Sequence, residues 1–283
     1  MSKIQIITDS DSSISPAIAK KYGITLVPIT IQFGEETFTT NLDIDDKLLF
    51  EKIDHLGKLP TTAAPCPAAF IAAFTEAFNT GTDEILCICV SSKVSSTYES
   101  ALLAVREFPG KHIRVVDSLY MTMGQGFLAL AASEAIANGA TLEEAAKLAE
   151  EMIPYLCTFA SFATLKYLAM SGRVGKFVAG MAGALDIRPL LTMKDGTLQI
   201  LERVRTRKNA MDRLVNLITG ALNEKTIEKA AIFHVNNHEE ALILEARLRE
   251  KLHLPAEVFI IEFTPGLSVH AGSGMVGGVF YSK

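Results

Sequence analysis

Short apolar runs alternate with helical patterns through the first half of the chain, and this alternation restricts the possible folds more than any other feature. The apolar runs predict strands at 4–7, 25–32, 84–90 and 112–116. Helices are expected from about Pro16, Asp45, Pro67 and Ser96, with two more after the last strand. Strands that alternate with helices in this way form parallel sheets with helices packed on them. We therefore predict a parallel-sheet α/β domain.

Three of the expected helices carry start signals. Ser15 precedes Pro16, and Pro is favoured at the first position of a helix. Ser96 and Thr141 are each followed three positions later by Glu, which is the spacing of a capping box. In such a box each side chain accepts a hydrogen bond from the other residue's backbone N–H. We expect helices to begin at these points.

The pattern changes near Pro154, and a length of 283 residues also favours two domains. We place an N-terminal domain at 1–153 and a C-terminal domain at 154–283. The second part opens with an apolar, strand-like segment at 155–162 and a glycine-rich stretch at 172–183. Its layout is therefore expected to differ from that of the first.

Turn signals in the second part indicate antiparallel pairing. The dipeptide Asp195-Gly196 separates two apolar runs and is a strong signal for a two-residue hairpin turn. Further strands are expected at 230–234, 256–262 and 275–281, and helices from about Asn209 and Asn237. We predict a mixed α+β domain here.

Composition excludes several classes of function. A net charge of −5 and a pI near 5.7 give no basic surface for nucleic acid. Hydrophobic residues make up 49% and the mean hydropathy is +0.26, yet no apolar run approaches the roughly 20 residues of a membrane span. Stable membrane insertion is therefore not expected. The N-terminus lacks the segments of a secretory signal, which indicates the cytoplasm. Four cysteines are too few for a disulfide scaffold and are expected to be reduced.

Two hydroxyl-rich segments, 60–67 and 91–98, lie where an expected strand or loop runs into a helix. A helix start leaves backbone N–H groups unpaired and carries a partial positive charge. Ser and Thr hydroxyls beside it can hold a carboxylate or a phosphate without Lys or Arg. The alternative is that Thr62, Ser95 and Ser96 only cap helices.

The segment Asp9-Ser10-Asp11 at the end of the first strand provides an enzyme alternative. Paired aspartates there resemble a Mg²⁺ site in a phosphoryl-transfer or hydrolytic enzyme using Asp9 and Asp11. Such an enzyme also needs a later Lys and a second acidic pair, and the sequence contains no convincing pair. A polar turn before a helix is the preferred interpretation.

Two other motifs imitate ligand sites. Gly272–Gly277 fits a GxGxxG pattern, but no helix and strand follow it as in a dinucleotide site. His234 and His238 are four residues apart across an expected strand-to-helix junction, so a zinc site is not predicted.

Three arginines, Arg203, Arg205 and Arg207, alternate along an expected strand and would point to one side of the sheet. They form either a solvated charged face or a docking patch, since guanidinium groups bind carboxylate and phosphate well.

A series of short motifs occurs in a specific order over nearly the whole chain. Each motif alone is weak, but their order and spacing together are specific. They are Ile7–Ser10, Pro60–Thr62 with Pro65 and Pro67, Ser92–Tyr98 with Ser100 and Ala101, Val116–Ser118, Ser171–Arg173, Arg203–Arg207 and His270–Gly274. By these motifs the chain resembles the DegV family, the fatty-acid-binding subunits of bacterial fatty acid kinase systems.

The resemblance implies a two-domain α/β protein that buries a long-chain fatty acid, such as palmitate, in an apolar tunnel closed by the C-terminal domain. The carboxylate would be held by Thr62 and Ser95, with Thr61, Ser96 and His270 as further candidates. No metal or other cofactor is implied.

A catalytic partner is also implied, because in this family a separate kinase phosphorylates the carboxylate of the bound lipid. The chain itself would be a non-catalytic carrier. Arg173, Arg203 and Arg205 would lie near the head group or on the surface that the kinase approaches.

The chain departs from the family pattern at five positions. Ala63 and Ala64 stand where Ser and Gln are usual, Cys66 and Ser96 where Ser and Gly are usual, and Ser273 where Pro is usual. These changes leave the two anchors intact and are expected to affect chain-length preference and head-group contacts.

Overall fold

The computed structural model describes residues 3–172 and 187–283. The chain forms two compact units. The first unit is Met1–Asp43 with Thr61–Pro154, and the second is Ile44–Pro60 with Tyr155–Lys283. A segment from the N-terminal part of the sequence, 44–60, thus belongs to the second unit.

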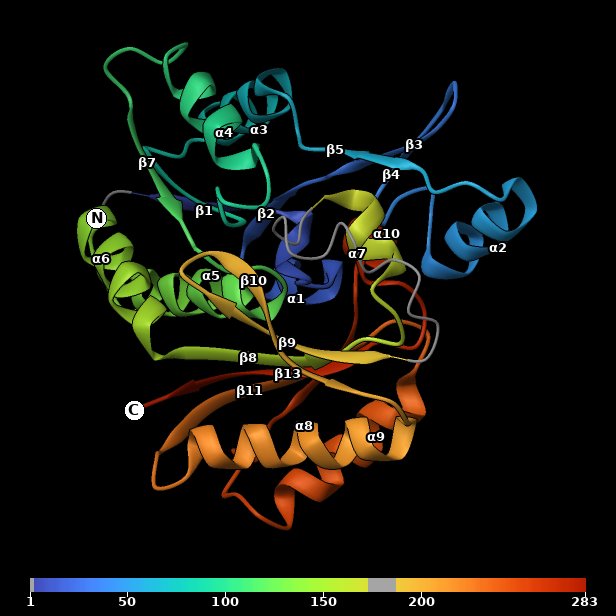
Figure 1. Ribbon diagram of the computed structural model, residues 1–283. Helices are drawn as coiled ribbons and strands as arrows, with labels where there is room; N and C mark the ends of the chain where they lie inside the picture. The colour runs from blue at the N-terminus through green and yellow to red at the C-terminus, as the bar shows by residue number, and fades with distance from the viewer. Residues whose placement is uncertain (1–2, 173–186) are drawn as a thin grey trace. The chain divides into compact units, whose positions relative to one another are not determined.

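The first unit contains the predicted parallel sheet (Figure 1). Its strands lie in the order β2-β1-β6-β7 and all pair in parallel. The strands are β1 (Ile4–Asp9), β2 (Ile24–Val27), β6 (Glu84–Cys89) and β7 (His112–Asp117). The helices are α1 (Pro16–Lys21), α3 (Pro67–Asn79), α4 (Thr97–Val105), α5 (Met123–Ala137) and α6 (Leu142–Met152). The α/β prediction is confirmed for this unit.

The first unit's core forms where apolar helix faces meet this sheet. Phe70 and Phe74 of α3 are fully buried and pack in one cluster with Ile85 and Cys87 of β6. The Sγ atoms of Cys87 and Cys89 lie 3.7 Å apart in this cluster, and both cysteines are free. Since each buried apolar side chain contributes about 1.5–3 kcal/mol, this cluster is a main source of the unit's stability.

The expected strand at 25–32 is wrong as one element. It divides at Pro28 into β2 and β3 (Thr30–Phe33), because Pro has no N–H to donate to a ladder. β3 pairs antiparallel with β4 (Glu36–Thr39) and β5 (Thr61–Ala63) in a separate three-stranded sheet. The sequence pattern did not reveal this sheet, since β5 has only three residues.

The second unit contains a mixed six-stranded sheet in the order β10-β9-β8-β13-β11-β12, as predicted for this half. Only β11 and β12 pair in parallel there; the other neighbours are antiparallel. The strands are β8 (Leu156–Ser161), β9 (Arg188–Lys194), β10 (Thr197–Val204), β11 (Ile227–His234), β12 (Phe259–Glu262) and β13 (Val276–Ser282). The predicted hairpin at Asp195-Gly196 is confirmed, with both turn residues at positive φ.

The helices of the second unit are α2 (Asp46–Leu56), α7 (Lys166–Ser171), α8 (Arg207–Leu222), α9 (His238–Arg249) and α10 (Pro265–Ala271). α8 and α9 lie side by side on one face of the sheet (Figure 1), where Leu214, Ile218 and Leu244 are fully buried. α10 was not predicted, because its apolar sequence has no helical period.

All three predicted helix starts are confirmed, and two of them have a side-chain cap. Ser15 Oγ accepts a hydrogen bond from the N–H of Ile18, and Thr141 forms both bonds of a capping box with Glu144. The Ser96 capping box is wrong, because Ser96 has ψ near 9° and its side chain accepts no capping bond. An extended backbone is what normally aims the N-cap oxygen at the helix.

Gly277 gives a direct test of the sheet packing. An alanine Cβ there would lie 2.5 Å from the carbonyl oxygen of Phe159 and from the ring of Phe233. Because backbone cannot yield easily, Gly277→Ala should lower the free energy of unfolding by about 2–3 kcal/mol in urea titrations. The control is Gly220→Ala in α8, which meets nothing within 4 Å and should gain about 0.5–1 kcal/mol. Equal stability of the two variants would contradict this packing.

Candidate functional site

Polar residues gather at the carboxyl edge of the parallel sheet, and the carboxylate of Asp9 joins three elements there. Asp9 Oδ1 accepts a hydrogen bond from Asp11 N at 3.0 Å. Its Oδ2 accepts from Val90 N at 2.8 Å and from Gln125 Nε2 at 2.9 Å. One carboxylate therefore connects the ends of β1 and β6 with α5.

Asp9 is fully buried, and burial raises the pKa of its carboxyl to about 6 even though three donors stabilise the charged form. Neighbouring Thr8 donates its hydroxyl to Ile88 O at 2.6 Å and accepts from Gln125 Nε2 at 2.8 Å. Both oxygens of Asp9 are thus engaged by protein donors. This argues against the Mg²⁺ interpretation of Asp9 and Asp11, and no group of three or more His, Cys, Asp or Glu that could hold a metal occurs among the described residues.

Asp117 fixes the loop that leads into α4. Its Oδ1 accepts from Ser92 N at 3.1 Å and from Leu119 N at 3.0 Å. Ser91 N donates to Tyr120 O at 2.8 Å in the same region. The loop after β6 is therefore held by the loop after β7, as expected where the ends of neighbouring parallel strands meet.

Ser95 lies at the end of this loop, beside the N-terminus of α4. Its hydroxyl is 2.8 Å from that of Thr97 and accepts a hydrogen bond from Thr97 N at 3.3 Å. Ser95 is half-buried, Thr97 is fully buried and Ser96 is exposed. Two hydroxyls and the positive end of a nine-residue helix therefore lie together, which suits an anionic group.

Thr61 and Thr62 lie on β5, where Thr62 pairs with Ile31 of β3. Successive residues of a strand point to opposite faces, so the two side chains diverge. Thr62 is half-buried and Thr61 is exposed. The capping alternative is wrong for Thr62, because it lies in a strand and the next helix, α3, begins after Cys66.

His270 belongs to the second unit, in the last turn of α10, and is half-buried. Gly272 follows it at φ +77°, and a Cβ there would be 2.3 Å from the ring of Tyr167. Ser268, in the same helix, donates its hydroxyl to Asp46 Oδ2 at 2.7 Å. Burial raises the pKa of Asp46 to about 7.

Gln125, Asp46 and Ser268 were not among the site residues predicted from the sequence. A polar Gln within an apolar helix was a usable signal for a buried role. Asp46 next to Asp45 instead resembled an ordinary acidic helix start, and Ser268 had no signal of its own.

The prediction that Arg203, Arg205 and Arg207 alternate on one strand is wrong. β10 ends at Val204 and Arg207 begins α8, because Thr206 caps that helix by accepting from Asn209 N at 3.2 Å. Arg203 and Arg205 are exposed. Arg173 lies outside the described residues.

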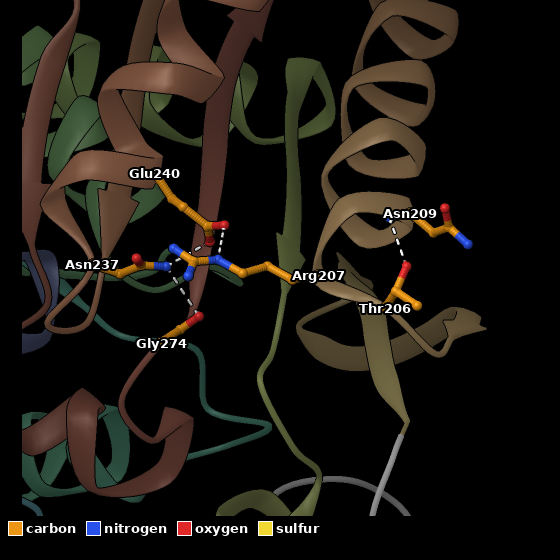
Figure 2. A network of polar contacts seen from close by, with 6 residues as sticks. All are labelled: Thr206, Arg207, Asn209, Asn237, Glu240 and Gly274. Atoms are coloured by element: carbon orange, nitrogen blue, oxygen red, sulfur yellow. Dashed lines mark hydrogen bonds and ion pairs between the residues drawn. The ribbon is translucent and has the colours of Figure 1, made fainter.

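Figure 2 shows the contacts of Arg207, whose Nε forms an ion pair with Glu240 of α9. Asn237 Nδ2 donates to Glu240 Oε2 at 2.8 Å and to the carbonyl oxygen of Gly274 at 3.2 Å. This network joins the starts of α8 and α9 to the loop that follows α10. The carbonyl group of Gly274 thus has a structural role as an acceptor for Asn237. The GxGxxG pattern continues into strand β13 and not into a helix, as a dinucleotide site would require.

His234 and His238 approach each other, with Nε2 of the first 3.3 Å from Nδ1 of the second. Burial lowers the pKa of His234. Glu262 lies 3.9 Å from His234 Nδ1. These contacts couple the end of β11 to the start of α9.

A search of the described helices for one that could cross a membrane found none.

Comparison with known proteins gives consistent matches over the whole chain. The family model described as an uncharacterised protein of the DegV family matches residues 3–283. A DegV domain-containing protein of Caldanaerobacter subterraneus subsp. tengcongensis is 31% identical over 100% of both chains.

Two solved structures match both fold and sequence. The structure described as fatty acid binding of a DegV family protein from Thermus thermophilus has a TM-score of 0.92 at 26% identity, covering 99% of this chain and 100% of its own. DegV of Bacillus subtilis, described as a fatty acid binding protein, has a TM-score of 0.88 at 28% identity, covering 100% of both chains.

The hydrogen bonds of Asp9 predict a structural role. Asp9→Ala would remove the acceptor of the Asp11 and Val90 N–H groups and one acceptor of the Gln125 amide, and should lower the free energy of unfolding by about 3 kcal/mol. Chemical denaturation at neutral pH measures this. The exposed Glu107→Ala in the same unit serves as the control and should change little. If Asp9→Ala is as stable as Glu107→Ala, the network does not support the sheet edge.

Proposed function

The chain belongs to the DegV family, and on that premise we propose that it binds a long-chain fatty acid and presents the carboxylate to a separate kinase. The observation that carries the proposal is the match to two fatty-acid-binding DegV structures over nearly the entire chain, at 26% and 28% identity. The motifs that first indicated the family are thus supported by the whole fold.

The energetics of a fatty acid suit such a carrier. A tail of about 14 methylenes gains roughly 0.8 kcal/mol per buried CH₂, or on the order of 10 kcal/mol before ordering costs. The tail would therefore supply most of the affinity. The carboxylate still needs hydrogen bonds when it leaves water, so the head group would fix the orientation of the lipid.

We propose Thr62 and Ser95 as the main carboxylate anchors. Both are half-buried, and Ser95 is next to the N-terminus of α4, where backbone N–H groups favour an anion. Thr61, Ser96 and His270 remain proposed contributors, although Thr61 points away from Thr62. Neutral donors hold a carboxylate while leaving an oxygen free to attack a phosphoryl group.

The proposal also includes a kinase partner, an arginine surface where that partner docks, and a location in the cytoplasm. Arg203 and Arg205 are exposed and suit a phosphate-bearing partner. Arg173 is proposed for the head-group region. We also propose that the chain divides near residue 153 into the domains 1–153 and 154–283, with the segment 44–60 of the first range packing in the second compact unit. Because the protein is proposed as a carrier, the phosphoryl-transfer chemistry would belong to the kinase.

Two measurements test the two halves of the proposal separately. Native mass spectrometry of the purified protein should detect a co-purified fatty acid, and its consistent absence after incubation with palmitate rejects lipid binding. The lipid-loaded protein is then mixed with ATP and a bacterial fatty acid kinase catalytic subunit. Failure to form acyl phosphate rejects the kinase part and leaves the binding part standing.

The carboxylate anchors are tested by comparing two ligands of equal chain length, hexadecanoic acid and hexadecanol. In the wild type the acid should bind more tightly, because only it uses the anchors. Thr62→Ala and Ser95→Ala should each reduce this preference by about ten- to a hundredfold, the loss of about one hydrogen bond to a charged group, with little effect on the alcohol. Thr37→Ala, an exposed threonine of β4, is the control. An unchanged preference in the double variant would exclude these anchors.

A further inference from the structure

A buried polar pair connects two helices of the second unit that are distant in sequence. Asp46, the first residue of α2, and Ser268 of α10 are 222 positions apart and form a 2.7 Å hydrogen bond. Asp46 is 5% exposed and Ser268 is fully buried. The second oxygen of Asp46, Oδ1, is also buried and has no hydrogen-bond partner among the described residues.

The charges around Asp46 make its ionisation unfavourable. Burial raises its pKa to about 7, the Ser268 hydrogen bond opposes that rise, and the carboxylates of Glu262 and Asp45 add to it. Asp45 is the N-cap of α2, and Glu262 ends β12 just before α10. The ionisable His270 lies on α10, in the turn after Ser268.

Aromatic contacts bring a third helix, α7, to the same place. Phe50 of α2 packs edge-on against Tyr167 of α7, with ring centroids 6.5 Å apart. The ring of Tyr167 also lies against Gly272, immediately after α10. Tyr167 itself has a raised pKa, mainly through burial.

The short helix α10 thus depends on contacts with its neighbours for its position. It has only seven residues, which is too short to be stable alone. Ser268 and His270 both belong to it and are less than one helical turn apart, so a movement of the helix at Ser268 would also move the histidine.

We propose that Asp46 is a positioning residue that holds α10, and with it His270, through Ser268, and that ionisation of Asp46 loosens this hold. The inference rests on the proposed function, in which His270 contributes to the head-group site. A neutral carboxyl is tolerated in a buried place with one hydrogen bond. A carboxylate there, beside two other acids, needs water or further donors, and the α2–α10 contact must open to supply them.

The experiment compares the binding of hexadecanoic acid and hexadecanol to the 283-residue chain from pH 5.5 to 8.5. Because the ligand also titrates, the preference of the wild type is divided by that of Asp46→Asn at each pH. Asn resembles the neutral carboxyl and can still accept from Ser268. We expect this quotient to fall about fivefold as the pH rises, with a midpoint near 7. The control is Glu51→Gln, an exposed substitution on α2, which should give the same pH profile as the wild type.

If Asp46→Asn folds poorly, a second variant tests the ionisation of Asp46 without changing Asp46 itself. Glu262→Gln removes a nearby negative charge, so Asp46 should ionise more readily and the midpoint should move to lower pH. The carbon-13 shift of the Asp46 carboxyl gives the same midpoint directly. An identical pH profile in the wild type and Asp46→Asn, or an unmoved midpoint in Glu262→Gln, overturns the proposal. Absence of acid binding in every variant, including the wild type, instead rejects the proposed function.

Global stability provides an independent check on Asp46. Its folded-state pKa is raised, so its contribution is complete below the unfolded value of 3.8 and is lost as the pH rises to about 7. The unfolding midpoint of the wild type should therefore fall relative to Asp46→Asn between about pH 4 and 7. Parallel curves over this range would contradict the raised pKa.

Discussion

The buried carboxylate of Asp9 is the interaction on which the carboxyl edge of the parallel sheet depends. It accepts hydrogen bonds from the loop after β1, from the residue after β6 and from Gln125 of α5. A buried charge is costly, and its raised pKa reflects that cost. The cost is offset because the same group accepts hydrogen bonds from the buried N–H groups of Asp11 and Val90 and from the amide of Gln125.

The hydrogen bonds at this sheet edge also hold the loop before α4 in place. Asp117 holds that loop from β7, and Ser95 follows at the start of the helix. The hydroxyl, the backbone N–H groups and the helix dipole are thereby fixed by the sheet itself. A proposed anionic site built in this way needs no arginine, and it leaves a bound carboxylate less strongly neutralised than an ion pair would.

In the second unit the proposed contributor His270 is held by contacts between helices and loops, because it lies on a short helix with few internal hydrogen bonds. The segment 44–60 leaves the N-terminal part of the chain to join this unit, and its helix α2 carries Asp46 to Ser268. On the other side, Asn237 holds the carbonyl of Gly274 (Figure 2). The helix that contains His270 and the loop after it are therefore held by residues from two separate parts of the sequence.

Local patterns in the sequence determined most strands and helices of the α/β unit, the Asp195-Gly196 hairpin and the Thr141 capping box, because each depends on residues within a few positions of one another. Ser96 has the same spacing as Thr141, but its side chain forms no cap, since its ψ near 9° is not the extended backbone that aims the N-cap oxygen at the helix. The bonds from Gln125 to Thr8 and from Ser268 to Asp46 span 117 and 222 positions. Only tertiary structure decided such contacts, because burial and pairing across that separation depend on how whole elements pack and leave no period in the sequence.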